Sequence, residues 1–416
     1  MQQPAREALD QRAPLPRAFA ASALALCVVL TSANLSTPLY PLWAARWGFS
    51  TAVLTIVFAA YVIGIIGVIL LAGRLSDALG RRRVLLPALA CSFAGAVMLF
   101  LARGVEWLIV ARALQGIAVG ATAGTATAAL SDYAPEDKPG RAAIVGSFVS
   151  VGGLSFGPLI AGMVSSLGFE PDAIVWPIDM VMIAASGSLV MRYLPQTRTF
   201  ARAAMRFQRI SVPRGIRLMF AGCAGVFLHG WVATAFFLAL GSTFVHDMLH
   251  RRQPVIGGLA VFGVFAASGL AQLLVRLTKS RNARRDMFAG MAAMAAGTGL
   301  FLTGLAQSSL LLFACGSVCV GAGQGISYVG SLASLQAVTP VTHRGEVMGA
   351  YYLAGYAGVA VFVPAAGFLA SSIGLLAAVS CVSGALMVSG VVASAVLFTP
   401  ACSQTFRELR CRVAAA

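Results

Sequence analysis

The sequence is short of charged residues, and of acidic residues above all. Only 11% of its 416 residues are Asp, Glu, Lys or Arg, and 14 acidic side chains stand against 30 basic ones. A soluble domain is about a quarter charged, so this composition excludes a soluble globular protein. Hydrophobic residues instead make up 59% of the chain, and the mean hydropathy is +0.85. We therefore expect a membrane protein.

Groups that carry out catalysis are scarce as well. The chain has 4 histidines, no carboxylate in the middle of an apolar run and no nucleophile beside a base. A membrane enzyme would need such a base, a carboxylate cluster or a metal-binding histidine pair. Most of the 8 cysteines lie in apolar runs, so no extracellular disulfide framework is expected. The sequence predicts neither an enzyme nor a resident metal or cofactor.

Long apolar runs are what the sequence has in abundance. A bilayer is crossed by about 20 apolar residues in a helix, and backbone exposed to lipid must be hydrogen-bonded internally. The runs therefore predict an all-α protein with 12 transmembrane helices. Their predicted bounds are 19–42, 52–72, 84–102, 107–130, 142–166, 174–194, 216–243, 254–275, 287–305, 309–335, 347–371 and 374–398.

The positive charges lie on one side of the predicted membrane. With the N-terminus in the cytoplasm, 25 of the 30 Lys and Arg fall in inner tails and loops. This is the positive-inside pattern, so the net charge of +16 indicates orientation and not a nucleic-acid partner. The first run, at about 24 residues, is long for a signal peptide, and we expect it to remain as a span. Both termini are predicted to be cytoplasmic.

A basic connector divides the runs into two sets of six. "RLSDALGRRR" at 74–83 aligns without a gap on "RLTKSRNARR" at 276–285, so the chain looks like a duplicated six-helix unit with parallel repeats. The predicted domains are a cytoplasmic tail (1–18), a first bundle (19–194), a cytoplasmic connector (195–215), a second bundle (216–398) and a second cytoplasmic tail (399–416).

The loop between the second and third runs, "AGRLSDALGRRRV" at 72–84, concentrates glycine and charge. Gly73 and Gly80 permit helices to approach closely and the chain to make a tight turn. Asp77 is a hydrogen-bond acceptor near a helix end. Arg81 and Arg82 stay outside the hydrocarbon. These residues could form a charged latch on the inner face, or the loop could only fix the topology.

The pattern Gly-x-Leu-x-Asp-x-x-Gly-Arg-Arg-Arg resembles the signature loop of the major facilitator superfamily. The 12 runs, the connector and the half-repeat extend this resemblance over essentially the whole chain. It implies two six-helix bundles that rock around a central cavity, with the loop stabilising the outward-open state. Lys279 stands where Asp77 stands in the first half, so we expect an asymmetric latch. The resemblance implies a small-molecule substrate, and we expect a monomer.

The fourth run holds "ARALQGIAVG" at 111–120, with Arg112 about one and a half turns inside it. A charge at the centre of a bilayer costs about 2.5–3.5 kcal/mol on insertion scales, so Arg112 could reach back to the outer interface instead. Arg-x-x-Gln-Gly resembles the family's motif in proton-coupled members, which implies that Arg112 faces the cavity and supports coupling. Gln115 is expected on the same helix face.

The fifth run holds "GGLSFGPLIAG" at 152–162, a groove of small residues around a proline. Helix packing and bending explain such a groove by themselves. The spacing also resembles the antiporter motif of drug:proton exporters, which implies a helix interface that favours export. The motif residues are Gly153, Gly157, Pro158, Ala161 and Gly162.

The carrier of a coupling proton is less apparent. Asp179 in "WPIDMV" could lie near Arg112 and form a pair that responds to protonation, or both could reach the interface. His229, near the middle of the seventh run, titrates in the physiological range but could equally be a packing residue.

Neutral polar and aromatic side chains are expected to line the cavity, which suits an amphiphilic or aromatic solute. These candidates are Asn34, Tyr61, Gln115, Trp231, Gln272, Gln324 and Tyr328. A soft cation such as Cu(I) is a further possibility, because thiols and thioethers recur at helical spacing, although they also pack as ordinary apolar side chains. The sulfur-bearing residues concerned are Met287, Met291, Met294, Cys315 and Cys319.

These observations together predict a transporter in the bacterial cytoplasmic membrane. The expected function is proton-coupled export of small amphiphilic or drug-like compounds by alternating access. Export of a sugar or metabolite, and import of a small solute or copper ion, are the alternatives.

Overall fold

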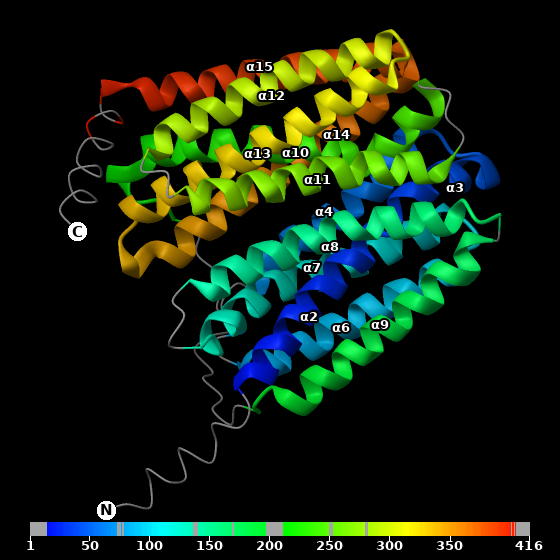
Figure 1. Ribbon diagram of the computed structural model, residues 1–416, viewed down its shortest axis with the longest axis horizontal. Coiled ribbons are helices and arrows are strands. Elements are labelled where there is room, and N and C mark those ends of the chain that lie inside the picture. The colour runs from blue at the N-terminus through cyan, green and yellow to red at the C-terminus, as the bar shows by residue number, and fades with distance from the viewer. Residues whose placement is uncertain are drawn as a thin grey trace, which may run out of the picture.

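The computed structural model is all-helical over the residues it describes (Figure 1). These are 15–72, 76, 79–135, 140–168, 170–196, 211–248, 253–278, 282–400, 402 and 404. Within them, 12 helices are long and apolar enough to cross a membrane, as the sequence predicted. The predicted connector at 195–215 lies largely outside the described residues.

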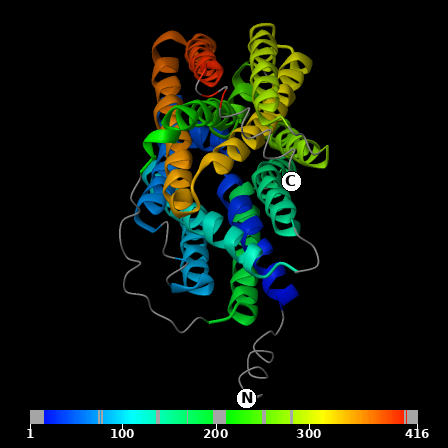
Figure 2. The ribbon, with the colours of Figure 1, turned by 90° about the vertical axis from the view of Figure 1, so that its left-hand side faces the viewer.

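The helices form two bundles of six, which Figure 2 shows end-on. The first bundle consists of α2 (Leu15–Asn34) with its short extension α3 (Tyr40–Trp47), α4 (Thr51–Ala72), α6 (Arg81–Phe100), α7 (Val105–Asp132), α8 (Arg141–Ser165) and α9 (Pro171–Tyr193). The second consists of α10 (Arg217–Thr243), α11 (Pro254–Leu277), α12 (Ala283–Ala306), α13 (Leu310–Val338), α14 (Arg344–Ile373) and α15 (Leu375–Phe398).

The helix ends differ from the predicted bounds. The first run does not continue as one helix to residue 42, because Pro38 and Pro41 each lack a backbone N–H and interrupt the hydrogen-bond ladder. The chain instead passes through a 3-10 turn, η1 (Thr37–Leu39), into α3. Several other helices begin earlier than predicted: α6 starts at Arg81, three residues before its apolar run. Arginine is a good helix former, so the helix continues past the apolar segment.

Two helix pairs hold the bundles together. α8 packs on α11 and α4 packs on α14, and both pairs cross from one bundle to the other. In the predicted duplication α4 corresponds to α11 and α8 to α14, so each interface is the counterpart of the other. This pairing is the arrangement that parallel repeats related by a two-fold axis produce.

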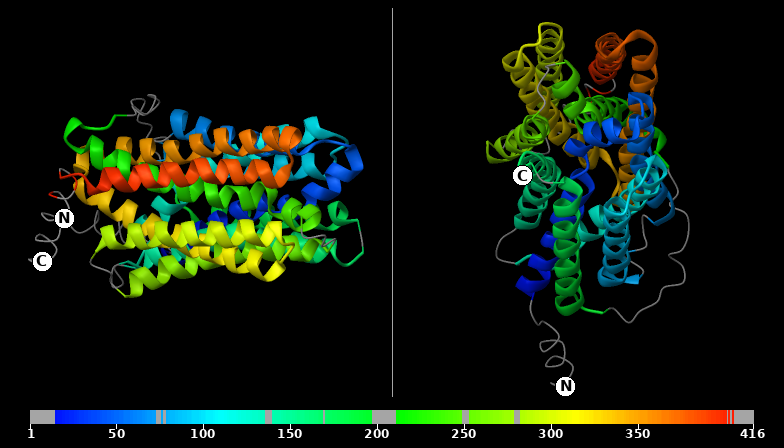
Figure 3. Two further views of the ribbon diagram at one scale, coloured as in Figure 1. Left: turned by 90° about the horizontal axis from the view of Figure 1, so that it is seen from above. Right: turned by 90° about the vertical axis from the view of Figure 1, so that its right-hand side faces the viewer.

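The two ends of the molecule have different character. We call the end at which α2 begins and α15 ends the basic end, because arginine-rich helix starts gather there, and the opposite end the α3 end (Figures 1 and 3). At the α3 end, η1 contacts α10 and α11 of the second bundle, and α3 contacts α10. The backbone N–H of Val255 on α11 also donates to Ser166 Oγ, at 3.2 Å. Figure 1 shows the bundles diverging toward the basic end.

Candidate functional site

Arg112 is enclosed inside the first bundle. Its side chain is 2% exposed, so it does not reach back to the surface. The guanidinium Nη1 donates to the Ala33 carbonyl of α2 and, at 2.7 Å, to Gln115 Oε1. The group also lies over the ring of Tyr61, with 4.4 Å from Cζ to the centroid. The charge is therefore stabilised by oxygen acceptors and an aromatic face.

Asp179 of α9 is fully buried and approaches the same part of α2. Its Oδ2 accepts a hydrogen bond from Ser32 Oγ at 2.7 Å, while Oδ1 has no hydrogen-bond partner within the described residues. Ser92 of α6 donates to the same Ser32 hydroxyl at 3.2 Å. One carboxylate oxygen is thus held and the other is left unpaired.

Neither arrangement considered from the sequence for Arg112 and Asp179 is found: both side chains are buried, and no ion pair joins them within the part of the chain that the structure describes. The reason is that α2 lies between them and offers each a different group. Asp179 accepts from the Ser32 hydroxyl, and Arg112 donates to the Ala33 carbonyl. Gln115 Nε2 donates to the Ser32 carbonyl at 3.3 Å. We call Arg112, Gln115, Ser32 and Asp179 the polar network.

Close helix approach sets the level of the polar network. A Cβ on Gly116 of α7 would lie 2.8 Å from the Tyr61 carbonyl carbon of α4, and one on Gly95 of α6 would lie 3.0 Å from Gln115 Cγ. Larger side chains at these positions would push α4 and α6 away from α7. Arg112 and Gln115, three residues apart, share the α7 face that results.

The small residues of α8 serve two different contacts. Gly153 and Gly157 pack on α2, where a Cβ on Gly153 would lie 2.8 Å from the Cys27 carbonyl oxygen and one on Gly157 would lie 3.2 Å from Asn34 Cβ. Asn34 itself donates to the Leu30 carbonyl at 2.6 Å. This half of the motif presses on α2 directly beside the polar network.

The other half of the motif contacts the second bundle. A Cβ on Gly162 would lie 2.9 Å from the Pro254 carbonyl oxygen of α11, and one on Gly258 of α11 would lie 3.2 Å from the Pro158 carbonyl carbon. Ala161 is fully buried. The α8 motif thus lies between α2 of the first bundle and α11 of the second.

The predicted latch is only partly within the described residues, since Gly73 and Asp77 lie outside them. Gly80 precedes α6 with a φ of +89°, a conformation that favours glycine. Arg81 donates through Nε to Asp132 Oδ2 of α7 at 2.9 Å, and Arg82 donates to the Leu194 carbonyl at 3.5 Å. Asp132 was not singled out from the sequence, although it lies at the end of α7.

Two of the predicted cavity glutamines form a separate chain in the second bundle. Gln272 Nε2 of α11 donates to Ser268 Oγ at 3.2 Å, and Ser268 donates to Gln324 Oε1 of α13 at 2.5 Å. The serine was not singled out from the sequence, although it lies one helical turn before Gln272. These residues tie α11 to α13.

An aromatic cluster lies between α10, α13 and α14. Phe227 is at its centre and stacks on Tyr351, with ring centroids 4.4 Å apart. Trp231 contacts Phe227 at 5.4 Å and Tyr356 at 5.7 Å. Tyr356 lies on α14, which packs on α4, the helix that carries Tyr61 in the first bundle. The full cluster is Phe227, Trp231, Tyr328, Tyr351, Tyr352 and Tyr356.

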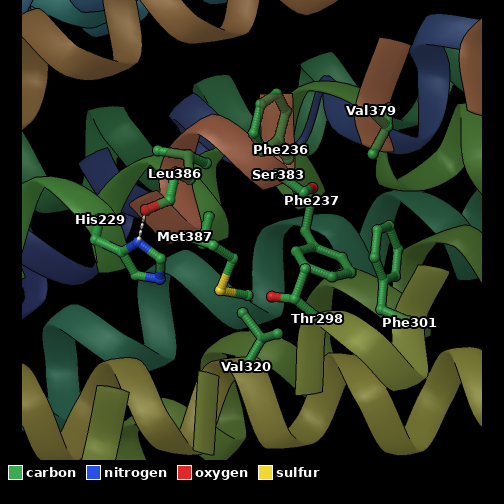
Figure 4. A pocket seen from close by; sticks show the side chains of 11 residues that line it. His229, Phe236, Phe237, Thr298, Phe301, Val320, Val379, Ser383, Leu386 and Met387 are labelled. Atoms are coloured by element: carbon green, nitrogen blue, oxygen red, sulfur yellow. Dashed lines mark hydrogen bonds between the residues drawn. The ribbon is translucent and has the colours of Figure 1, made fainter. Parts of the chain in front are cut away.

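His229 does not join the aromatic cluster. Its Nδ1 is 2.7 Å from the Leu386 carbonyl of α15, and the ring lines a small cavity of about 20 Å³ between α10, α12, α13 and α15 (Figure 4). His229 and Trp231, two residues apart, project to different sides of α10. The histidine therefore lies on the side of α10 that faces away from the aromatic cluster.

The sulfur-bearing residues do not converge on a metal site. Cys315 is exposed, whereas Met287 and Met294 are fully buried and pack against glycines of α13. Within the described residues, no three His, Cys, Asp or Glu side chains are grouped closely enough to hold a metal ion. The copper alternative gains no support from these positions.

Comparison with known sequences identifies the family. The sequence matches the profile of the Major Facilitator Superfamily over residues 22–274 and again over 222–405. The chain belongs to the Major Facilitator Superfamily. It is a multi-pass membrane transporter and not an enzyme.

The alignments of this transporter with curated relatives cover only a part of each relative's length. An uncharacterized MFS-type transporter of Mycobacterium tuberculosis is 32% identical over 35% of this chain and 21% of its own. Multidrug resistance protein 3 of Bacillus subtilis is 31% identical over 34% of this chain and 27% of its own. The 4-hydroxybenzoate transporter PcaK of Pseudomonas putida is 28% identical over 38% of this chain and 35% of its own. These bacterial relatives fit a location in the inner membrane.

Solved structures share the fold of this transporter. A D-xylose–proton symporter superposes with a TM-score of 0.72 at 16% identity, covering 92% of this chain and 96% of that one. A bacterial homologue of the human lysosomal transporter Spinster, in an inward-facing and unoccupied conformation, gives 0.62 at 14% identity, covering 96% and 98%. At these identities the likeness establishes the fold.

Proposed function

We propose that the transporter is a proton-coupled exporter of small amphiphilic compounds, with Asp179 as the residue that binds the coupling proton. The polar network is the observation that carries this proposal. Asp179 is fully buried, receives one hydrogen bond and has one oxygen without a partner. Burying an unpaired carboxylate is costly, so its charge state depends on whether water and protons reach it.

Protonation of Asp179 can change the hydrogen bonds of the polar network. An ionised Asp179 accepts from Ser32 through Oδ2. A proton on Oδ2 would make this oxygen a donor, and the Ser32 hydroxyl would then turn to accept from it. Ser32 is followed by Ala33, whose carbonyl Arg112 holds, and by Asn34, on which Gly157 of α8 packs. A change at Asp179 therefore acts on α2 where α2 meets α8, and α8 in turn contacts α11.

The aromatic cluster supports the proposed substrate class. Its rings offer stacking faces and hydroxyl groups, and α14, which carries Tyr356, packs on α4, where the Tyr61 ring lies under the guanidinium of Arg112. Aromatic faces bind planar or cationic groups of amphiphilic ligands. The similarity to a multidrug resistance protein and the α8 motif support export as the direction.

Flux in reconstituted liposomes tests the proposal. We expect an imposed pH gradient to drive accumulation of a lipophilic substrate by the wild-type protein. Asp179→Asn and Arg112→Ala should abolish driven accumulation, although the variants fold and insert. Asp247→Asn is the matched control, because Asp247 is exposed at the α3 end and, among the residues that the structure describes, its side chain bonds His246. Full pH-driven accumulation by Asp179→Asn would exclude Asp179 as the carrier.

A second candidate function is proton symport of aromatic acids. The buried cation Arg112 beside aromatic rings favours an anionic ring compound, and the similarity to a 4-hydroxybenzoate transporter points the same way. The sign of proton movement separates the two functions. An exporter that exchanges substrate for protons releases them on binding substrate, whereas a symporter takes them up.

A further inference from the structure

The contact that holds His229 is the counterpart of the contact that holds Asp179. α2 and α9 are the first and sixth spanning helices of the first bundle, and α10 and α15 are the first and sixth of the second. Ser32 of α2 bonds Asp179 of α9, and His229 of α10 bonds the Leu386 carbonyl of α15. Each bundle therefore has a buried acid or base that is hydrogen-bonded between its first and sixth helices.

The hydrogen bond to Leu386 fixes the tautomer of His229. A carbonyl oxygen only accepts, so Nδ1 carries the hydrogen in this 2.7 Å contact and Nε2 keeps its lone pair in the neutral ring. Nε2 has no hydrogen-bond partner within the described residues, although the side chain is only 2% exposed. Figure 4 shows this nitrogen on the cavity side of the ring, on the side where Met387 lies. The site thus has an unused basic atom directed into it.

The cavity also contains unused hydroxyl capacity. Ser383 of α15 is buried and makes no hydrogen bond within the part of the chain that the structure describes. Thr298 of α12 donates to the Met294 carbonyl at 2.8 Å, which leaves its oxygen free to accept. The volume of about 20 Å³ exceeds the roughly 10–15 Å³ that one water molecule needs, and a buried water requires two to four polar partners. The volume condition is met, and three polar side chains lie on the wall.

No fixed charge lies on the cavity wall. Of the helices that form it, α12 contributes Thr298 and Phe301, α13 contributes Val320, and α15 contributes four uncharged side chains. The nearest cysteines are placed differently, since Cys319 of α13 packs on Gly297 and Cys381 of α15 is exposed. His229 is the titratable group among the residues that line the cavity.

We propose that this cavity holds one water molecule on Nε2 of His229 and is a second proton-binding site, so that each bundle has its own. A proton delivered through the water binds the Nε2 lone pair, and the new Nε2–H donates to the water oxygen. Nδ1–H stays on the Leu386 carbonyl. The role in transport rests on the proposed function, while the site itself does not.

Nitrogen NMR of the histidine ring tests the site directly. Replacing His246, His250 and His343 by Gln leaves His229 as the one histidine of the full chain. With ¹⁵N-histidine in detergent, we expect Nε2 to change reversibly from unprotonated to protonated between about pH 8 and pH 5, while Nδ1 stays protonated. Ser383→Val, which fills the cavity, should remove this titration within the same range. An Nε2 signal that is unchanged over the whole range would overturn the proposal.

Proton counting separates this site from the one on Asp179. A pH drop applied to the purified variant that lacks His246, His250 and His343 should load one proton fewer per molecule when His229 is also replaced by Gln. Asp179→Asn should retain the NMR titration of His229. If ligand binding releases no proton in any variant while His229 still titrates, the proposed function fails and the second site stands. If that variant loads the same number of protons with and without His229→Gln, the second site fails and Asp179 remains testable.

Discussion

Gly162→Ala is expected to shift the transporter away from the conformation described above without unfolding it. A Cβ on Gly162 would lie 2.9 Å from the Pro254 carbonyl oxygen and 3.2 Å from Val255 Cα. Both atoms are helix backbone, so no side chain can rotate away. The helices α8 and α11 must separate by about 0.5 Å to restore ordinary contact, which forfeits part of the surrounding packing.

The magnitude follows from the cost of overpacking, which is about 1–3 kcal/mol. This cost applies only while α8 and α11 touch at the α3 end, because the added methyl group meets no neighbour once they part. A bias of about 1–3 kcal/mol changes the ratio of two conformations by about 5- to 150-fold. The variant should therefore populate the conformation that is open at the α3 end.

Spin-label distances measure this population. Leu167, just after α8, and Leu259 on α11 are both exposed, so cysteines there accept labels in a background without the native cysteines. We expect Gly162→Ala to enlarge the long-distance fraction. Gly152→Ala is the matched control, since its nearest neighbouring atoms would be 3.7 Å away. Identical distance distributions in the two variants and the wild type would refute the assignment of Gly162 to a moving interface.

Three further outcomes follow from the contacts. Ser32→Ala removes the hydrogen bond to Asp179. Because a hydrogen bond to a charged group is worth about 1.5–3 kcal/mol, the initial rate of pH-driven flux should fall at least about tenfold. An unchanged rate would contradict the role of the polar network. Asp132→Asn breaks a partly exposed ion pair with Arg81, so thermal stability in detergent should change by less than about 1 kcal/mol while access to the basic end increases, as cysteine labelling would show. Trp231→Ala removes two aromatic contacts worth about 0.5–1.5 kcal/mol each, so calorimetry should show weaker binding of aromatic ligands but unaltered binding of aliphatic ones.

The sequence was sufficient for the number and order of the spanning helices, because each apolar run is long enough to be recognised by itself. It was less reliable at helix ends. The first run reads as continuous to residue 42, but Pro38 and Pro41 divide it and create α3. The start of α6 at Arg81 could not be predicted from hydropathy, since the helix continues where the apolar run has stopped.

The site was predictable as a set of residues but not as a set of contacts. Arg112 and Gln115 are one turn apart on one helix, so their shared face follows from periodicity. The bond from Ser32 to Asp179 joins residues 147 positions apart, and nothing in either local pattern distinguishes it from a direct pair with Arg112. Tyr351 and Tyr356 likewise read as ordinary apolar-run residues, and only the packing of α14 on α10 brings them to Phe227 and Trp231.

Proton exchange by the purified transporter tests the central claim most directly. The protein is placed in detergent and weak buffer, and a lipophilic cation, a neutral aromatic compound, an aromatic acid or a sugar is added while the pH is recorded. The account predicts proton release with an amphiphilic ligand in the wild type and in Asp247→Asn, and none in Asp179→Asn. Ligand binding that calorimetry detects but that moves no proton in the wild-type protein would contradict it.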